Sequence, residues 1–134
     1  MEKQNRKLFF LVALPRSGNT LFTSIINQNP KIACTANSLT LEIMKNLYLL
    51  KKTDVFQLFP DYKSLNNILD NVYNLYYKDW PQQIIIDRGP VTLTGNPGNF
   101  ELMKQHFKYE FKCIVLLRDL IEVLASYMKW YKET

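Results

Sequence analysis

The chain has 134 residues, of which 47% are hydrophobic, 22% charged and 13% aromatic. The length is enough for one compact domain with a core and too short for two, and the composition excludes a disordered chain. The formal net charge of +5 suits an anionic ligand, but no basic run is longer than Lys51-Lys52, which argues against a nucleic-acid-binding tract. Two cysteines and one histidine form no Cys/His cluster, so we predict no metal site.

The first apolar run, at residues 8–14, follows basic residues and imitates a signal peptide. It is short for such a peptide, Pro15-Arg16 replaces the small residues of a cleavage site, and it cannot span a bilayer. We therefore predict a buried strand in a cytoplasmic protein without a membrane span.

Further along the chain, apolar runs alternate with amphipathic stretches. The predicted strands cover residues 8–14, 31–35, 83–87 and 112–117. The predicted helices cover residues 20–29, 39–51, 62–77, 100–107 and 119 onward. We expect Ser38 and Asn99 to cap the second and fourth helices. On the last helix we expect an inward stripe of Leu120, Val123, Leu124 and Tyr127. This alternation predicts a single α/β domain over residues 1–134, with a mostly parallel sheet flanked by helices.

Arginines are few and unevenly placed. Only four of the 17 basic residues are arginines: Arg6, Arg16, Arg88 and Arg118. Except for Arg6, each lies within two residues of the end of a predicted strand, and open α/β sheets bind ligands beyond the carboxyl ends of their strands. Since arginine suits bidentate capture of phosphate or sulfate, we predict an anion site there.

The first motif joins the first strand to the first helix and reads Pro-Arg-Ser-Gly-Asn-Thr-Leu, residues 15–21. Gly18 permits a tight turn, the helix N-terminus offers unpaired N–H groups, and Arg16 adds charge. Ser17, Asn19 and Thr20 add side-chain donors. The loop lacks the GxxxxGK[ST] pattern of a Walker A motif. The alternative is an ordinary strand–helix turn capped by Ser17.

This motif resembles the 5′-phosphosulfate-binding loop of sulfotransferases that use 3′-phosphoadenosine 5′-phosphosulfate (PAPS), most closely the tyrosylprotein-sulfotransferase branch. The resemblance implies a P-loop-like sulfotransferase fold. It also implies that the loop holds the cofactor through Arg16, Ser17, Gly18, Asn19, Thr20 and Leu21. Arg16 would contact the sulfuryl group as a catalytic residue.

The second motif is an apolar strand followed by Arg118, with Ser126 eight residues later. It resembles the 3′-phosphate site of the same family. A serine two turns into the following helix can face the same cleft as the strand-end arginine. The alternative is that Arg118 pairs with Asp119 or Glu122 and that Ser126 only packs.

The third motif, Asp-Arg-Gly-Pro-Val at residues 87–91, resembles the segment whose lysine assists the leaving phosphate in tyrosylprotein sulfotransferases. The resemblance gives that catalytic role to Arg88, which stabilises charge without acting as a general acid at neutral pH. The alternative is an Arg88–Asp87 ion pair.

No general base is apparent. The family's acid has no counterpart at residues 34–38, Glu42 is the nearest carboxylate, and His106 is expected at the surface. Sulfotransferase domains also continue into a C-terminal part that this chain lacks. We therefore expect either a fragment or a short form completed by another chain or an oligomer.

The expected function is transfer of a sulfuryl group from PAPS to an unidentified hydroxyl or amine acceptor, without a metal. The alternatives are a non-catalytic nucleotide-binding module, a P-loop kinase or phosphatase relative, and an interaction domain.

Overall fold

The computed structural model describes residues 6–89, 96–107 and 112–133, and within them it is an α/β structure built on one parallel sheet. The strands are β1 (Lys7–Ala13), β2 (Ile32–Cys34), β3 (Ile84–Asp87) and β4 (Cys113–Leu116). Their order is β2-β3-β1-β4, and all three pairings are parallel. The predicted fold class is therefore confirmed at the level of a parallel sheet flanked by helices.

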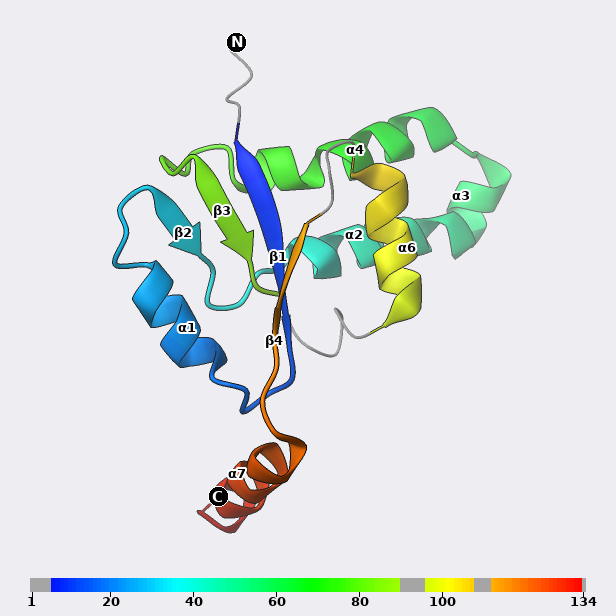
Figure 1. Ribbon diagram of the computed structural model, residues 1–134. Coiled ribbons are helices and arrows are strands. Elements are labelled where there is room, and N and C mark those ends of the chain that lie inside the picture. The colour runs from blue at the N-terminus through cyan, green and yellow to red at the C-terminus, as the bar shows by residue number, and fades with distance from the viewer. Residues whose placement is uncertain (1–5, 90–95, 108–111, 134) are drawn as a thin grey trace.

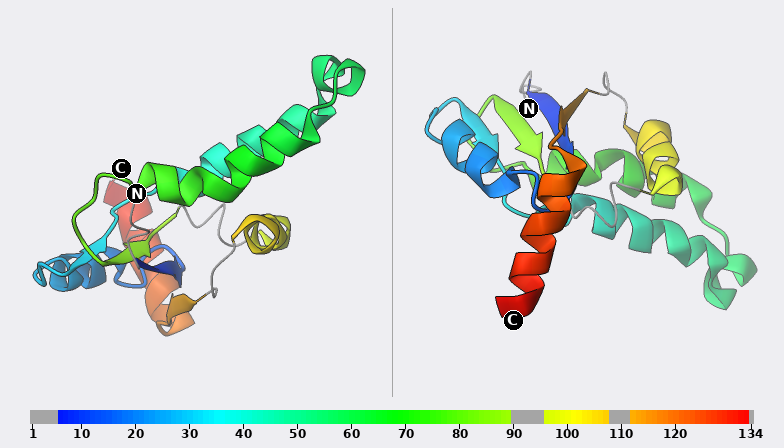
Figure 2. Two further views of the ribbon diagram at one scale, coloured as in Figure 1. Left: turned by 90° about the horizontal axis from the view of Figure 1, so that it is seen from above. Right: turned by 60° about the horizontal axis from the view of Figure 1, so that its bottom comes forward.

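Helices cover both faces of this sheet (Figure 1). They are α1 (Asn19–Ile26), α2 (Thr40–Leu49), the 3₁₀ turn η1 (Leu50–Lys52), α3 (Asp54–Leu58), α4 (Tyr62–Tyr76), α6 (Pro97–His106) and α7 (Leu120–Glu133). Helix α1 lies on one face, and α2, α4 and α6 lie on the other. Figure 2 shows α2 and α4 side by side, extending past the sheet to α3 at their far end.

The alternation of side chains along β1 creates two cores. Phe10 points to the α2, α4 and α6 face, where it meets Tyr73 and Phe107 edge to face. Leu11 points to the opposite face and packs with Ile86 and the α1 side chains. A central parallel strand is apolar along its whole length because helices cover both faces of the sheet and successive side chains enter opposite cores.

Two helix starts differ from the predictions. Helix α6 is capped by Asn96, whose side chain accepts from the Gly98 amide, because Pro97 at the first helical position starts the helix earlier than Asn99. Leu39 occupies the N-cap position of α2, without a side-chain capping bond. Ser38 lies one residue earlier, but its hydroxyl oxygen accepts from the Thr40 amide at the start of α2, as expected of a cap, while its O–H donates to the Asp87 carboxylate.

The last helix does not pack back onto the sheet. Helix α7 points away from the carboxyl ends of the strands, and within the described residues most of its predicted inward stripe is not covered by another element (Figure 1). Only Val123 of that stripe is buried, and Leu120, Leu124 and Tyr127 are exposed. The predicted stripe is therefore wrong except at Val123.

Arg6 is the one arginine that does not follow a predicted strand, and it binds the segment that connects α4 to β3. Its guanidinium donates to the backbone carbonyl oxygens of Tyr77, Trp80 and Gln82. A cation is favourable there because the C-terminus of a helix presents unpaired carbonyl groups. Across the described ranges, no helix is both long and apolar enough to cross a membrane.

Candidate functional site

The β1–α1 loop forms a tight turn through two residues with positive φ. Arg16 has φ 67° and Gly18 has φ 92°. The turn is closed by the Ser17 amide and the Asn19 side-chain amide, which both donate to the carbonyl of Leu14. The Asn19 side chain is therefore turned inward and buried, and its NH₂ group is used within the turn instead of being offered to a ligand.

The N-terminus of α1 is open. Gly18 is the N-cap, no side chain caps the helix, and its first turn carries no acid. A Cβ atom built on Gly18 would meet nothing within 4 Å. The first intrahelical bond runs from the Phe22 amide to the Gly18 carbonyl, so the amides of Asn19, Thr20 and Leu21 precede the helical ladder. These amides and the positive end of the helix dipole make this loop suitable for an anion.

The two predicted phosphate motifs meet beyond the carboxyl ends of β1 and β4. The Arg16 Nε donates to the Ser126 hydroxyl at 2.9 Å, across 110 residues of sequence. The Arg118 Nη1 donates to the carbonyl oxygen of Arg16 at 3.0 Å. Parallel pairing of β1 with β4 explains the contact, because it puts the two strand ends next to each other. We call this group of residues, Arg16, Arg118 and Ser126, the arginine cluster.

Acidic groups of α7 moderate the charge of the arginine cluster. Glu122 accepts from the Arg118 Nε at 2.9 Å, and both side chains are largely exposed. This is the pairing considered as an alternative for Arg118, and it coexists with the contact to Arg16. Asp119 caps α7 by accepting from the amides of Ile121 and Glu122, so the start of α7 is already occupied. The open helix end is therefore that of α1.

Arg88 lies at the end of β3, which pairs with the other side of β1. Its backbone is fixed to the loop after β2, because its amide donates to the Thr35 hydroxyl and its carbonyl accepts from the Ser38 amide. Pro90 and Val91 of the third motif lie outside the described residues.

A buried carboxylate, which sequence reasoning missed as a site, precedes Arg88. Asp87 is 2% exposed. One of its oxygens, Oδ2, accepts from the hydroxyls of Ser38, Thr40 and Tyr77 at 2.6 to 2.8 Å. These hydroxyl groups, and not an ion pair with Arg88, satisfy the carboxylate. Burial beside Asp87 raises the pKa of Tyr77, which keeps its phenol protonated as a donor.

The carboxyl of Asp87 should make stability depend on pH. Burial raises its pKa above the ordinary value, although the three hydroxyl donors oppose the rise. The unfolded chain thus releases this proton at lower pH than the folded chain. The contribution of Asp87 to stability is complete at pH values below its pKa in the unfolded chain. It is lost as the pH rises through the pKa of Asp87 in the folded chain. Relative to Asp87→Asn, the wild-type free energy of unfolding should therefore fall as pH rises from about 4. Urea denaturation from about pH 4 to about pH 8 measures this, and a constant difference would contradict it.

Replacing Gly18 should lower the free energy of unfolding through backbone strain, and not through a steric clash of the new side chain. Gly18→Ala places a Cβ in open space but keeps φ at 92°, so we expect a loss of about 1 kcal/mol in the free energy of unfolding. Gly18→Asn should cost less, because asparagine adopts the left-handed conformation more readily. Urea denaturation of both variants checks this, and equal losses would argue against backbone strain as the cause.

The candidate bases do not face the arginine cluster through any described contact. His106 is buried, contrary to the expectation, because it pairs with Asp70 of α4 at 2.9 Å. Glu42 lies in the first turn of α2 and accepts from Asn46. No group of three or more His, Cys, Asp or Glu side chains that could hold a metal occurs in the described part of the chain.

Comparison with protein-family models gives no match, and comparison with curated protein sequences gives no significant match. The assignment of this site therefore depends on the geometry of its own side chains.

Proposed function

We propose that this chain binds PAPS at the carboxyl end of its sheet and transfers the sulfuryl group to a hydroxyl or amine acceptor. The observation that carries the proposal is the arginine cluster, in which Arg16 and Ser126 are in direct contact across 110 residues of sequence. Arg118 joins them through the Arg16 carbonyl. Two donor groups at adjacent strand ends suit a ligand with two separate phosphates. The proposed sulfotransferase-type fold is in keeping with the parallel sheet.

The proposed roles follow from donor chemistry. The amides at the start of α1, around Gly18, would bind the 5′-phosphate end, and Arg118 with Ser126 would bind the 3′-phosphate. In the transfer, the acceptor oxygen bonds to sulfur, the bond from sulfur to the 5′-phosphate oxygen breaks, and the acceptor proton passes to a base. Arg16 and Arg88 would stabilise the charge that develops on the departing phosphate.

A second candidate, a nucleotide-binding module without catalysis, is favoured by one specific observation. The carboxylates described near the strand ends already have partners: Asp87 is buried under hydroxyl groups, Asp119 caps α7, and Glu122 is paired with Arg118. None of them is positioned as an unoccupied general base.

Titration calorimetry with 3′-phosphoadenosine 5′-phosphate and with ATP tests the proposal. We expect the 3′-phosphorylated nucleotide to bind at least tenfold more tightly, since ATP lacks the group that Arg118 and Ser126 would recognise. Tighter binding of ATP would favour a P-loop kinase relative and contradict the proposal.

Turnover separates the two candidates that bind the nucleotide. Incubation with ³⁵S-labelled PAPS and a panel of phenol, sugar and amine acceptors should give labelled product if the chain is an enzyme. Tight binding of the nucleotide with no transfer to any acceptor would favour the non-catalytic module.

A further inference from the structure

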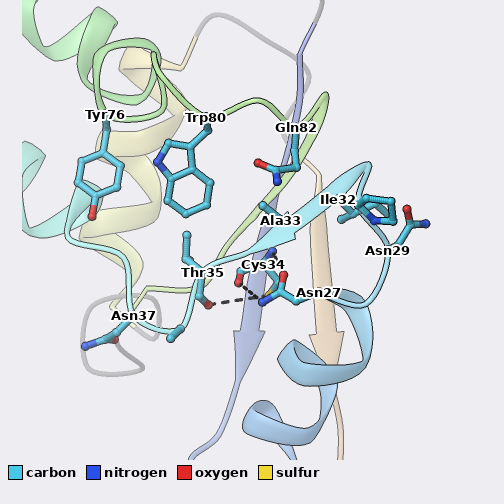
Figure 3. Close-up of a pocket in the computed structure, with 12 residues that line it drawn as sticks. Asn27, Asn29, Ile32, Ala33, Cys34, Thr35, Asn37, Tyr76, Trp80 and Gln82 are labelled. Carbon is cyan, nitrogen blue, oxygen red and sulfur yellow. Dashed lines mark hydrogen bonds between the residues drawn. The ribbon is translucent and has the colours of Figure 1, made fainter.

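A separate pocket lies at the outer edge of the sheet, between β2 and the end of α4. Its volume is about 540 Å³, within the usual range for small-molecule sites. Figure 3 shows Tyr76, the last residue of α4, and Trp80, from the segment after it, on one wall, and Asn27 with β2 on the other. Asn37 lies at one end and Gln82 at the other. None of these residues belongs to the arginine cluster.

The lining of this pocket is polar but uncharged. Its side chains are amides, aromatic rings, the hydroxyls of Thr35 and Tyr76, a thiol and apolar groups, and none of the described lining residues is Lys, Arg, Asp, Glu or His. In a chain with 22% charged residues and a net charge of +5, this composition contrasts with the arginine cluster. A charged ligand would lack a counter-charge here, so the chemistry favours a neutral one.

Both walls of the pocket are held in place. Arg6 binds the carbonyls of Trp80 and Gln82, and the indole of Trp80 packs edge to face on Tyr77 with ring centroids 5.2 Å apart. On the opposite wall, the Asn27 side chain donates to the Cys34 carbonyl at 2.9 Å and accepts from the Cys34 amide at 2.7 Å. The edge of β2 is therefore already paired at Cys34, which disfavours addition of a peptide strand there.

The remaining groups define the ligand. Asn27 and Asn29 are used in bonds to the backbone, whereas no described hydrogen bond uses the side-chain amides of Asn37 or Gln82. An amide both donates and accepts, which matches hydroxyl groups that do the same. Tyr76 and Trp80 come from the same wall, so they offer an apolar surface on one side and do not sandwich a flat base.

We propose that this pocket binds a neutral, hydroxyl-rich ligand of the sugar class, with its ring against Trp80 and its hydroxyls bonded by Asn37 and Gln82. The proposal is independent of the nucleotide site, because the two sites share no residue.

The test uses the full chain and saturation-transfer-difference NMR. The probes are methyl β-glucopyranoside, methyl β-galactopyranoside, N-acetylglucosamine and cellobiose, with glucuronate, methyl sulfate and adenosine as comparisons. We expect saturable binding of at least one neutral saccharide. Trp80→Leu should weaken it about tenfold, and Asn37→Ala about fivefold.

Asn37 is exposed, so Asn37→Ala keeps the test valid if Trp80→Leu fails to fold. Trp130→Phe on α7, which does not line the pocket, serves as the matched control and should leave binding unchanged. The proposal is overturned if no neutral saccharide binds, if only adenosine or a charged probe binds, or if Asn37→Ala binds as tightly as the wild type.

Discussion

Replacing Asp87 with alanine should lower the free energy of unfolding by about 3 kcal/mol, the largest stability effect expected in this chain. The substitution leaves the hydroxyls of Ser38, Thr40 and Tyr77 buried without their shared acceptor. Each unsatisfied donor carries a desolvation cost, and the carboxylate's volume becomes a cavity. Urea denaturation followed by circular dichroism measures the loss.

Two controls isolate the cause. Asp87→Asn keeps an oxygen that can accept from the hydroxyls, so its loss should be clearly smaller. Asp79→Ala removes an exposed aspartate nearby in the chain and should change stability little. An alanine variant at residue 87 that is as stable as the wild type would show that the hydroxyl network contributes nothing.

Arg118→Ala should remove the preference for a 3′-phosphate. In the wild type we expect 3′-phosphoadenosine 5′-phosphate to bind about ten- to a hundredfold more tightly than adenosine 5′-phosphate, the range that charge-assisted hydrogen bonds supply. In the variant the two nucleotides should bind with similar affinity, because the guanidinium proposed to bind the 3′-phosphate is gone. Titration calorimetry measures both affinities, and circular dichroism checks the fold.

Neighbouring variants sharpen this prediction. Glu122→Gln should tighten binding, since it removes the carboxylate that competes for the Arg118 guanidinium. Lys129→Ala removes another exposed cation of α7 and should leave the preference unchanged. If Arg118→Ala still discriminates between the nucleotides, residue 118 does not bind the 3′-phosphate.

The architecture could be predicted because it depends on local patterns. Four apolar runs became the four described strands, and the amphipathic stretches between them became helices within a few residues of the expected ends. The contact of Arg16 with Ser126 also follows from topology, since β4 pairs directly with β1. Parallel pairing brings the carboxyl ends of neighbouring strands to the same edge of the sheet, where open α/β sheets bind ligands.

Features that depend on tertiary packing could not be predicted. Ser38 accepts from the first amide of α2, as its place in the sequence predicts, but its hydroxyl also donates to a carboxylate 49 residues away. Arg6 resembles a solvating charge in a polar leader, yet its partners are carbonyls beyond residue 70. The stripe on α7 has helical periodicity, and periodicity alone does not tell whether a layer is present to cover it.

A comparison of two nucleotides by chemical shift tests the two-phosphate site most directly. ¹⁵N-labelled chain is titrated with adenosine 5′-phosphate and then with 3′-phosphoadenosine 5′-phosphate, and both amide and arginine Nε signals are followed. We predict that the amides of Gly18 to Leu21 shift with both nucleotides. Arg118 Nε and the Ser126 amide should shift only with the second. Shifts confined to other parts of the sheet, or identical shifts at residues 118 and 126 with both nucleotides, would contradict a site that holds two phosphates between these strand ends.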